Sequence, residues 1–260
     1  MKDMVSPEVQ ALGVCDRIVT SLDRVMQVAG RLTEDTAREH LKHGLARRLR
    51  LLHLGLAQIV AIAHPRRREP LSDNEQLNLT LHLNSFYLHI RGCLDNLAWC
   101  LAHELKVFGS QIQEETIASK VNLFGGPLLG TLTSAAPSVG ASVRRHTEWH
   151  RDLKNIRDPV AHRIPIYAVP AVLTSEEAER HRDVYNRAEE ARVVGDLDSA
   201  GRLFDELSSI GNYVPYFAHS PSAIGSLRKV YPQVVDDLSV VLELLEDVIT
   251  YLELRPLGRS

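Results

Sequence analysis

Cysteine is scarce in this chain of 260 residues, and the little that is present forms no disulfide pattern. The three cysteines are Cys15, Cys93 and Cys100. An odd, widely spaced set excludes the disulfide framework that stabilises small secreted proteins. We therefore expect a protein of a reducing compartment, the cytoplasm.

Long apolar runs are also absent. No segment approaches the roughly 18 uncharged apolar residues of a membrane-spanning helix, and the opening MKDMVSPEV lacks the apolar core of a signal peptide. The sequence FGGPLLG lacks the lysine of a phosphate-binding loop, and no nucleophile elbow is present. These absences predict a soluble protein with no membrane partner.

Neither sign of charge dominates, because 30 basic residues face 33 acidic ones and the net charge is -3. This balance excludes a protein coated in positive charge for bulk nucleic-acid binding. The charges are nevertheless uneven. Residues 38–68 contain eight Lys and Arg against the single acid Glu39, whereas residues 236–253 contain six acids and no base. A local basic surface is therefore compatible with the sequence.

Helical periodicity is what the sequence has in abundance. Ser6 and Pro7 predict the start of a helix that ends near residue 31. A second helix is expected over 33–64, and a capping box at 72–75 predicts a third that ends near residue 108. The second helix carries a stripe of apolar residues at spacings of three and four, which predicts burial: Leu41, Leu45, Leu49, Leu52, Leu56, Ile59 and Ala63.

The second half of the chain changes in texture. A fourth helix is expected over 138–156, preceded by a Gly- and Pro-rich loop that holds at most a short helix. The next element expected is an edge strand near 164–169. Two polar helices over 174–195 and 198–211 follow it, then the extended NYVPYFAHS and a last helix over 233–254. We predict one mainly α domain, an up-and-down bundle of residues 6–163 and 221–256. Residues 164–220 form an insertion with a two-stranded β-ribbon.

The segment NIRDPVAHRIPIYAVP, residues 155–170, places Arg157 and His162 five positions apart. On one unbroken helix these side chains would lie about 140° apart around the axis. Pro159 cannot donate to the carbonyl of Asn155, which predicts a break, with Asp158 capping a new turn. Such a break would bring Arg157 and His162 toward one cleft. The alternative is an ordinary helix end with solvated charges.

The residues RDPVAH resemble the R-x4-H motif of the HEPN superfamily, in which Asn, Asp or His usually follows the arginine. FYLHIRGCLDNLAWCL, residues 86–101, is similar to the second-helix region of HEPN-like bacterial proteins, and AHRIPIY with VPYFAHS is similar to uncharacterised bacterial members. The likeness covers about residues 70–170. It implies a four-helix bundle that forms a homodimer, with two motifs across a shared cleft.

The resemblance also implies a metal-independent endoribonuclease of the defence or toxin type, with an antitoxin or defence protein as partner. Some toxin members carry a tyrosine two residues after the histidine, where an antitoxin modifies it. This chain has Ile164 at that position, which puts that form of control in doubt.

The chemistry suits the motif, because cleavage of RNA without a metal needs a group that moves a proton and a cation that holds the phosphate. A histidine such as His162 can serve as base or acid, and Arg157 can meet two phosphate oxygens at once. Asp158 either orients one of them or acts only as a cap. We expect no cofactor and no metal.

Further residues are candidates for contacts with substrate. His146, His150 and Arg157 lie within about 40° of one another on a helix, which predicts a polar wall, joined by Lys154, that faces the substrate. HTEWH does not fit a zinc protease, because Glu148 does not follow the first histidine directly. The alternative for these polar residues is a purely structural role.

On the third predicted helix, Arg91 and Asp95 are spaced as an ion pair, with Trp99 one turn further on. They form either a structural ion pair or contacts near the Arg157 and His162 cleft. His89, Cys93, Cys100 and His103 share a side of the same helix but span about 21 Å. They therefore predict packing and not one metal site.

The run PRRREP, residues 65–70, is expected to be solvated, with contact to phosphate as the alternative. Three functional readings thus follow from the sequence. They are an endoribonuclease, an inactive HEPN-like module that binds RNA, a nucleotide or a protein, and a helical scaffold.

Overall fold

The computed structural model describes residues 6–109, 117–219 and 227–255. The elements in chain order are α1 (Pro7–Ala29), α2 (Asp35–Glu39), the π-helical turn η1 (His40–Leu45), α3 (Ala46–Ile62), α4 (Asp73–Glu104), the 3-10 turn η2 (Ala118–Lys120), α6 (Gly126–Ala135), α7 (Pro137–Arg145), α8 (Thr147–His162), β1 (Tyr167–Ala168), α9 (Ser175–Val193), α10 (Leu197–Ser208), β2 (Tyr216–Ala218), β3 (Arg228–Lys229) and α11 (Gln233–Leu254). The fold is mainly α with a small antiparallel sheet, as the sequence predicts.

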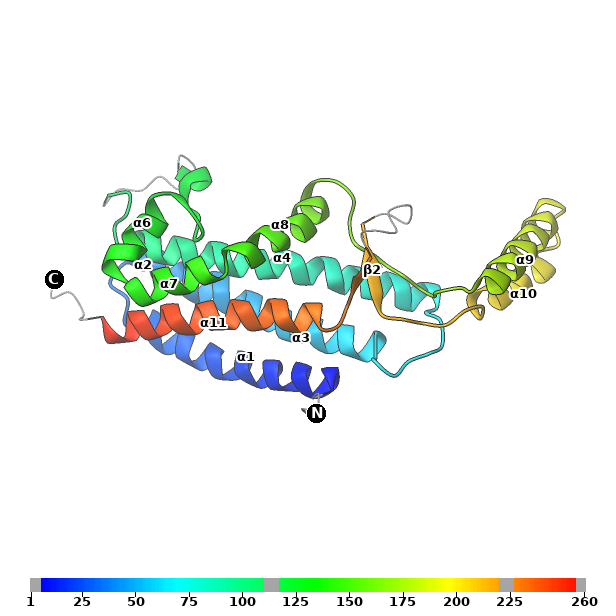
Figure 1. The fold of residues 1–260 in the computed structure, drawn as a ribbon, viewed down its shortest axis with the longest axis horizontal. Coiled ribbons are helices and arrows are strands. Elements are labelled where there is room, and N and C mark those ends of the chain that lie inside the picture. The colour runs from blue at the N-terminus through cyan, green and yellow to red at the C-terminus, as the bar shows by residue number, and fades with distance from the viewer. Residues whose placement is uncertain (1–5, 110–116, 220–226, 256–260) are drawn as a thin grey trace.

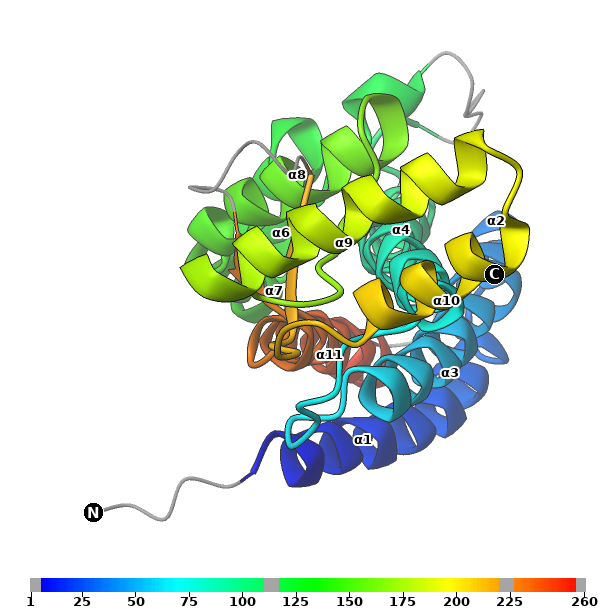
Figure 2. The same ribbon diagram turned by 90° about the vertical axis from the view of Figure 1, so that its right-hand side faces the viewer.

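The long helices α1, α3, α4 and α11 run side by side (Figure 1). Seen from the end, α4 and α11 lie between the α1 and α3 layer and the helices α6, α7 and α8 (Figure 2). Helices α9 and α10 pack on each other and project as a hairpin from one end of the bundle (Figure 1). None of the helices in the described ranges is long and apolar enough to cross a membrane.

The apolar stripe predicted for the second helix is buried, with every member at 0 % exposure: Leu41, Leu45, Leu49, Leu52, Leu56, Ile59 and Ala63. The stripe packs on α4 and α1 of the same chain. Burying a leucine contributes roughly 1.5 to 3 kcal/mol, so this contact is a major part of the core. Because the chain's own core uses the stripe, it offers no surface to a second copy.

Two predicted helices are each divided in the structure. The second consists of α2, η1 and α3, because a π-helical turn is inserted at His40–Leu45. The fourth is divided at His146, whose φ of -98° and ψ of 15° end α7 and begin α8. The hydroxyl of Thr147 donates to the carbonyl of Arg144 at 2.9 Å, in place of the next helical N–H. The expected short helix in the Gly- and Pro-rich loop is α6.

The sheet has three strands in the order β1-β2-β3, not the predicted two. The third, β3, lies beyond the predicted insertion and pairs Lys229 with Tyr216. β1 runs along α4, where the side chain of Asn84 donates to the carbonyl of Ile166 at 3.0 Å and accepts from its N–H at 2.8 Å. Thr80, one turn earlier, accepts from the N–H of Ala168 at 3.2 Å. Side chains of α4 therefore replace a neighbouring strand and fix the chain that leaves α8.

A buried carboxylate joins three of the helices. Asp237 of α11 is 1 % exposed and accepts hydrogen bonds from Tyr87 of α4 at 3.1 Å and from Trp149 of α8 at 2.8 Å. Gln233 donates to both carboxylate oxygens, at 2.9 and 3.0 Å. Burial raises the pKa of Asp237, and the three side-chain donors oppose that rise. The carboxylate fixes the position of α8 relative to α4 and α11.

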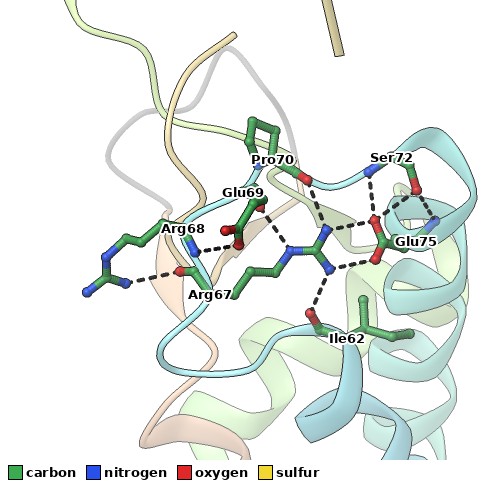
Figure 3. A network of polar contacts seen from close by, with 7 residues as sticks. All are labelled: Ile62, Arg67, Arg68, Glu69, Pro70, Ser72 and Glu75. Atoms are coloured by element: carbon green, nitrogen blue, oxygen red, sulfur yellow. Dashed lines mark hydrogen bonds and ion pairs between the residues drawn. The ribbon is translucent and has the colours of Figure 1, made fainter. Parts of the chain in front are cut away.

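The run PRRREP was expected to be solvated, but Figure 3 shows that Arg67 within it is surrounded by hydrogen-bond partners. Its guanidinium donates to both carboxylate oxygens of Glu75, at 2.6 and 2.8 Å, and also to the carbonyls of Ile62, Glu69 and Pro70. Glu75 in turn completes the capping box with Ser72 at the start of α4. The pKa of Glu75 falls to about 2, chiefly because Arg67 donates to it. Arg67 therefore ties the loop to the first turn of α4.

We predict that Arg67→Met destabilises the protein by about 2 to 3 kcal/mol, because it leaves the carbonyls and carboxylate without their charged donor. Chemical denaturation at pH 7 measures the loss. The matched control is Arg66→Met, whose side chain is 82 % exposed and which should change stability by less than about 0.5 kcal/mol. Equal effects of the two substitutions would contradict the structural role of Arg67.

Candidate functional site

The predicted break at Pro159 does not occur. α8 continues through Pro159 to His162, and the N–H of Arg163 donates to the carbonyl of Pro159 at 2.8 Å. The proline lies in the last turn, where only the carbonyl of Asn155 loses a partner. Asp158 therefore caps no new turn. Its carboxylate instead accepts from Nη1 of Arg157 at 3.1 Å.

Because α8 is continuous, Arg157 and His162 do not converge within one chain. Five residues of α-helix separate the two side chains by about 140°. Arg157 is partly buried, with 26 % of its side chain exposed, and its charge acts on Asp95 of α4. His162 is exposed and has no hydrogen bond or ion pair within the described residues. The prediction that a helix break brings Arg157 and His162 toward one cleft is therefore wrong for the single chain.

The structure does bring Arg91, Asp95, His150 and Arg157 together where α4 packs on α8. Nη2 of Arg91 lies 3.0 Å from Oδ1 of Asp95, and its Nη1 lies 2.7 Å from Nε2 of His150. Arg91 therefore links the carboxylate on its own helix to a histidine on the neighbouring one.

The charges of three arginines from three helices, Arg91, Arg157 and Arg48, all lower the pKa of Asp95. Desolvation by burial is the larger effect, and it leaves the pKa of Asp95 raised. Asp95 and Asp158, whose carboxylate accepts from Arg157, supply two negative charges against three guanidinium groups, which leaves one positive charge in excess. That excess favours an anion at the site.

Arg48 of α3 is the member of this group that the sequence did not indicate. Its Nε donates to Oδ1 of Asn96 at 3.0 Å, and its Nη1 lies 3.3 Å from Nδ1 of His89. The guanidinium occupies the space that a side chain at Gly92 would need. The sequence does contain a glycine, Gly92, in the middle of a predicted helix and a basic segment that includes Arg48. Only the packing of α3 on α4 shows that these two residues meet.

His150 is buried at 7 % exposure, so it is not part of a wall that faces a substrate. Its ring stacks on Phe124, with centroids 4.0 Å apart and planes 5° apart. Arginine has only donors, so Nε2 of His150 accepts from Arg91 and the proton lies on Nδ1. Burial, followed by the charge of Arg91, lowers the pKa of His150 to about 4. His150 therefore positions Arg91 as a neutral acceptor.

His146 and Lys154 do not extend this group into one polar wall. His146 lies at the boundary of α7 and α8, and its Nε2 is 3.3 Å from a carboxylate oxygen of Glu243 on α11, without hydrogen-bond geometry. The His146 ring therefore faces Glu243 on α11. Lys154 is exposed, and its charge contributes to the lowered pKa of His150.

An unpaired donor marks the polar group. Nε of Arg157 is buried and has no hydrogen-bond partner among the residues that the structure describes. Buried donors are nearly always satisfied, and a guanidinium N–H binds a phosphate or carboxylate oxygen most strongly. The position therefore suits an anionic ligand. We call Arg48, Arg91, Asp95 and Arg157 the arginine cluster.

No group of three or more His, Cys, Asp or Glu residues within the described ranges is arranged to hold a metal ion. Cys93 and Cys100 are fully buried, and burial raises the pKa of the Cys93 thiol to about 12. His89 contacts Arg48, whereas His103 stacks on Trp99. The four residues do not meet, as their span along the helix predicted.

Comparison of the chain with known protein families, with curated proteins and with solved structures finds no match. The geometry of the site and the R-x4-H motif are therefore the observations that bear on function.

We predict that the stability of the protein falls between pH 6.5 and pH 4 because of His150. The folded state lowers the pKa of His150 from 6.5 to about 4, so the unfolded chain takes up a proton in this range before the folded one does. The contribution is complete above about pH 6.5 and is lost as the pH falls, by up to about 3 kcal/mol.

His150→Gln keeps an acceptor for Arg91 but cannot titrate. Denaturation of parent and variant at pH 7.5 and pH 4.5 measures the effect, and the parent should lose the greater stability on acidification. Parallel losses in the two proteins would exclude His150 as the titrating group.

Pro159→Ala is expected to leave α8 in place and to stabilise it, because alanine supplies the N–H that the carbonyl of Asn155 lacks. The gain is at most about 3 kcal/mol. Thermal unfolding followed by circular dichroism measures it. A lower melting temperature in the variant would show that the proline stabilises this turn.

Proposed function

We propose that the protein is a metal-independent endoribonuclease of the HEPN type that acts as a homodimer. The observation that carries the proposal is the arginine cluster, in which guanidinium groups from α3, α4 and α8 act on Asp95 and the buried Nε of Arg157 has no acceptor among the described residues. The arginines of this cluster are partly exposed, so they can contact the phosphate group of a phosphodiester. The R-x4-H resemblance adds a histidine on the same helix.

In the proposed reaction, His162 takes the proton of a 2′-hydroxyl group, whose oxygen attacks the adjacent phosphorus. The bond from phosphorus to the 5′-oxygen breaks, that oxygen takes up a proton, and a 2′,3′-cyclic phosphate remains. Arg157 stabilises the charge on the phosphate oxygens. Because Arg157 and His162 of one chain point apart, the proposal requires that each site combine Arg157 of one subunit with a second subunit's histidine.

A row of exposed leucines supports the dimer. On α4, Leu77, Leu81 and Leu88 are 66 %, 62 % and 41 % exposed. Their spacing places them on one stripe that continues into Arg91 and Asp95. A two-fold partner on this row would lie beside the arginine cluster, and two-fold dimers are the commonest closed assembly. Unlike the leucine stripe of the second predicted helix, which the core buries, this row is available to a second copy.

We predict that the purified protein cleaves single-stranded RNA in EDTA and leaves 2′,3′-cyclic phosphate ends. Arg157→Ala and His162→Ala should each reduce cleavage by at least about 100-fold, because each removes a group that acts in the transition state. Gel analysis of end-labelled RNA measures the rate, and thermal unfolding confirms that both variants are folded. Cleavage that stops with EDTA, or that persists in both variants, would refute the proposal.

Mixing the two inactive variants tests whether the site is shared. If Arg157 and His162 act across the dimer, a heterodimer of the two variants contains one intact site, and a random mixture should regain about a quarter of the parent's activity. A site built within one chain would stay inactive in every combination. Light scattering of the parent at micromolar concentration should accordingly report a dimer, about twice the 29.1 kDa of one chain.

A second candidate is an inactive HEPN-like module that binds RNA, a nucleotide or a protein. It is favoured by the separation of Arg157 and His162 on a continuous α8. RNA binding without cleavage would support this candidate. A protein that neither binds nor cleaves RNA would instead be a helical scaffold. A role in defence or as a toxin, with an antitoxin or defence protein as partner, depends on the resemblance alone.

A further inference from the structure

One turn beyond Asp95 on α4, three aromatic rings gather beside the arginine cluster. The centroids of His40, Trp99 and His103 lie 5.7 to 5.9 Å from one another, and the planes of His40 and Trp99 differ by 7°. Two rings on opposite faces of the indole would be at least about 7 Å apart, twice the contact distance of about 3.5 Å. The two imidazoles therefore lie on the same side of Trp99. We call these rings the aromatic layer.

His40 of the aromatic layer also lines an open groove of about 340 Å³. The other lining residues are Thr36, Glu39, His43, Gly44 and Arg47. The groove follows the π-helical turn η1, where the extra residue widens the helix. Trp99 itself packs partly against the core, so His40 is the ring that meets the groove.

Two glycines make this arrangement possible. A side chain at Gly44 would collide with the amide of Asn96, and one at Gly92 would collide with the guanidinium of Arg48. The Asn96 amide lies 3.3 Å from Nδ1 of His40 and accepts from Nε of Arg48 at 3.0 Å. One side chain thus connects the groove to the arginine cluster and holds both in fixed positions.

The charge in the groove is mixed. Arg47 is exposed and its Nη2 lies 3.2 Å from Nδ1 of His43, while Glu39 supplies a carboxylate on the same lining. A bare phosphate would be repelled by Glu39. A flat ring with both donors and acceptors on its edge suits a lining that offers a guanidinium, a carboxylate and an imidazole face.

We propose that this groove is a nucleobase subsite for single-stranded RNA, with a base stacked on His40 and its edge near Glu39 and Arg47. The adjoining phosphate lies in the arginine cluster, since Asp95 and Trp99 are only about 6 Å apart along α4. This inference rests on the proposed function, because it names where the substrate's base is held. The chain binds RNA by base stacking as well as by charge.

Tryptophan fluorescence tests this subsite, because the chain has only two tryptophans, Trp99 and Trp149. Trp149 donates to the buried Asp237 and lies on α8, not in the aromatic layer. Titration of His162→Ala protein with an eight-nucleotide adenylate RNA in EDTA should quench the fluorescence. Trp99→Phe should abolish this quenching and retain binding, whereas Trp149→Phe should keep it.

His40→Leu should weaken RNA binding by roughly 5- to 100-fold, the range for loss of one stacked base. Arg47→Ala, at an exposed position that carries no packing, should weaken RNA binding several-fold. This second variant keeps the test valid if His40→Leu does not fold. Inorganic polyphosphate, which has no bases, should bind to the arginines without quenching Trp99.

Equal quenching by polyphosphate, unchanged affinity in both His40→Leu and Arg47→Ala, or no binding of RNA would overturn the subsite. The outcome is separable from that of the proposed nuclease. RNA that quenches Trp99 but is never cleaved by the parent supports the subsite and refutes the nuclease, whereas cleavage without quenching refutes the subsite alone.

Discussion

The buried carboxylate of Asp237 is the interaction on which the arrangement of the helices depends. It accepts hydrogen bonds from Tyr87 of α4 and Trp149 of α8, and its own helix α11 supplies the third donor, Gln233. A buried charge without these donors would be strongly unfavourable. The three helices are therefore held in one register, and α8 presents Arg157 to α4 while His162 remains exposed at the helix end.

From that register follows the electrostatic character of the arginine cluster. Arg48, Arg91 and Arg157 come from separate helices, yet all act on Asp95. His150 stays neutral because burial and Arg91 lower its pKa to about 4, so it adds no further positive charge. The site is thus polar and moderately cationic. Under the proposed function, this charge suits one bound phosphate group more than a long stretch of RNA backbone.

Much of the fold could be predicted from the sequence, because its signals are local. The capping boxes at Ser72 and Thr174 begin α4 and α9 where they were expected, and the leucine stripe is buried as its spacing required. The predictions that failed are the undivided second and fourth helices, the two-stranded ribbon, and the roles of single residues in a tertiary setting. Pro159 was expected to break α8, but near a helix end only one carbonyl loses its partner, and the helix continues. The π-helical turn at His40 carries no comparable local signal.

The sequence by itself determined a mainly α chain and placed Arg91, Asp95, His150 and Arg157 among the polar residues of interest. It did so because period, caps and charge spacing act within a few residues along one helix. Only the tertiary structure decided that Arg48 joins them, that His150 is buried beneath Arg91, and that His146 turns toward α11. The reason is that contacts between helices depend on how each rotates about its axis, and packing of the whole core sets that rotation.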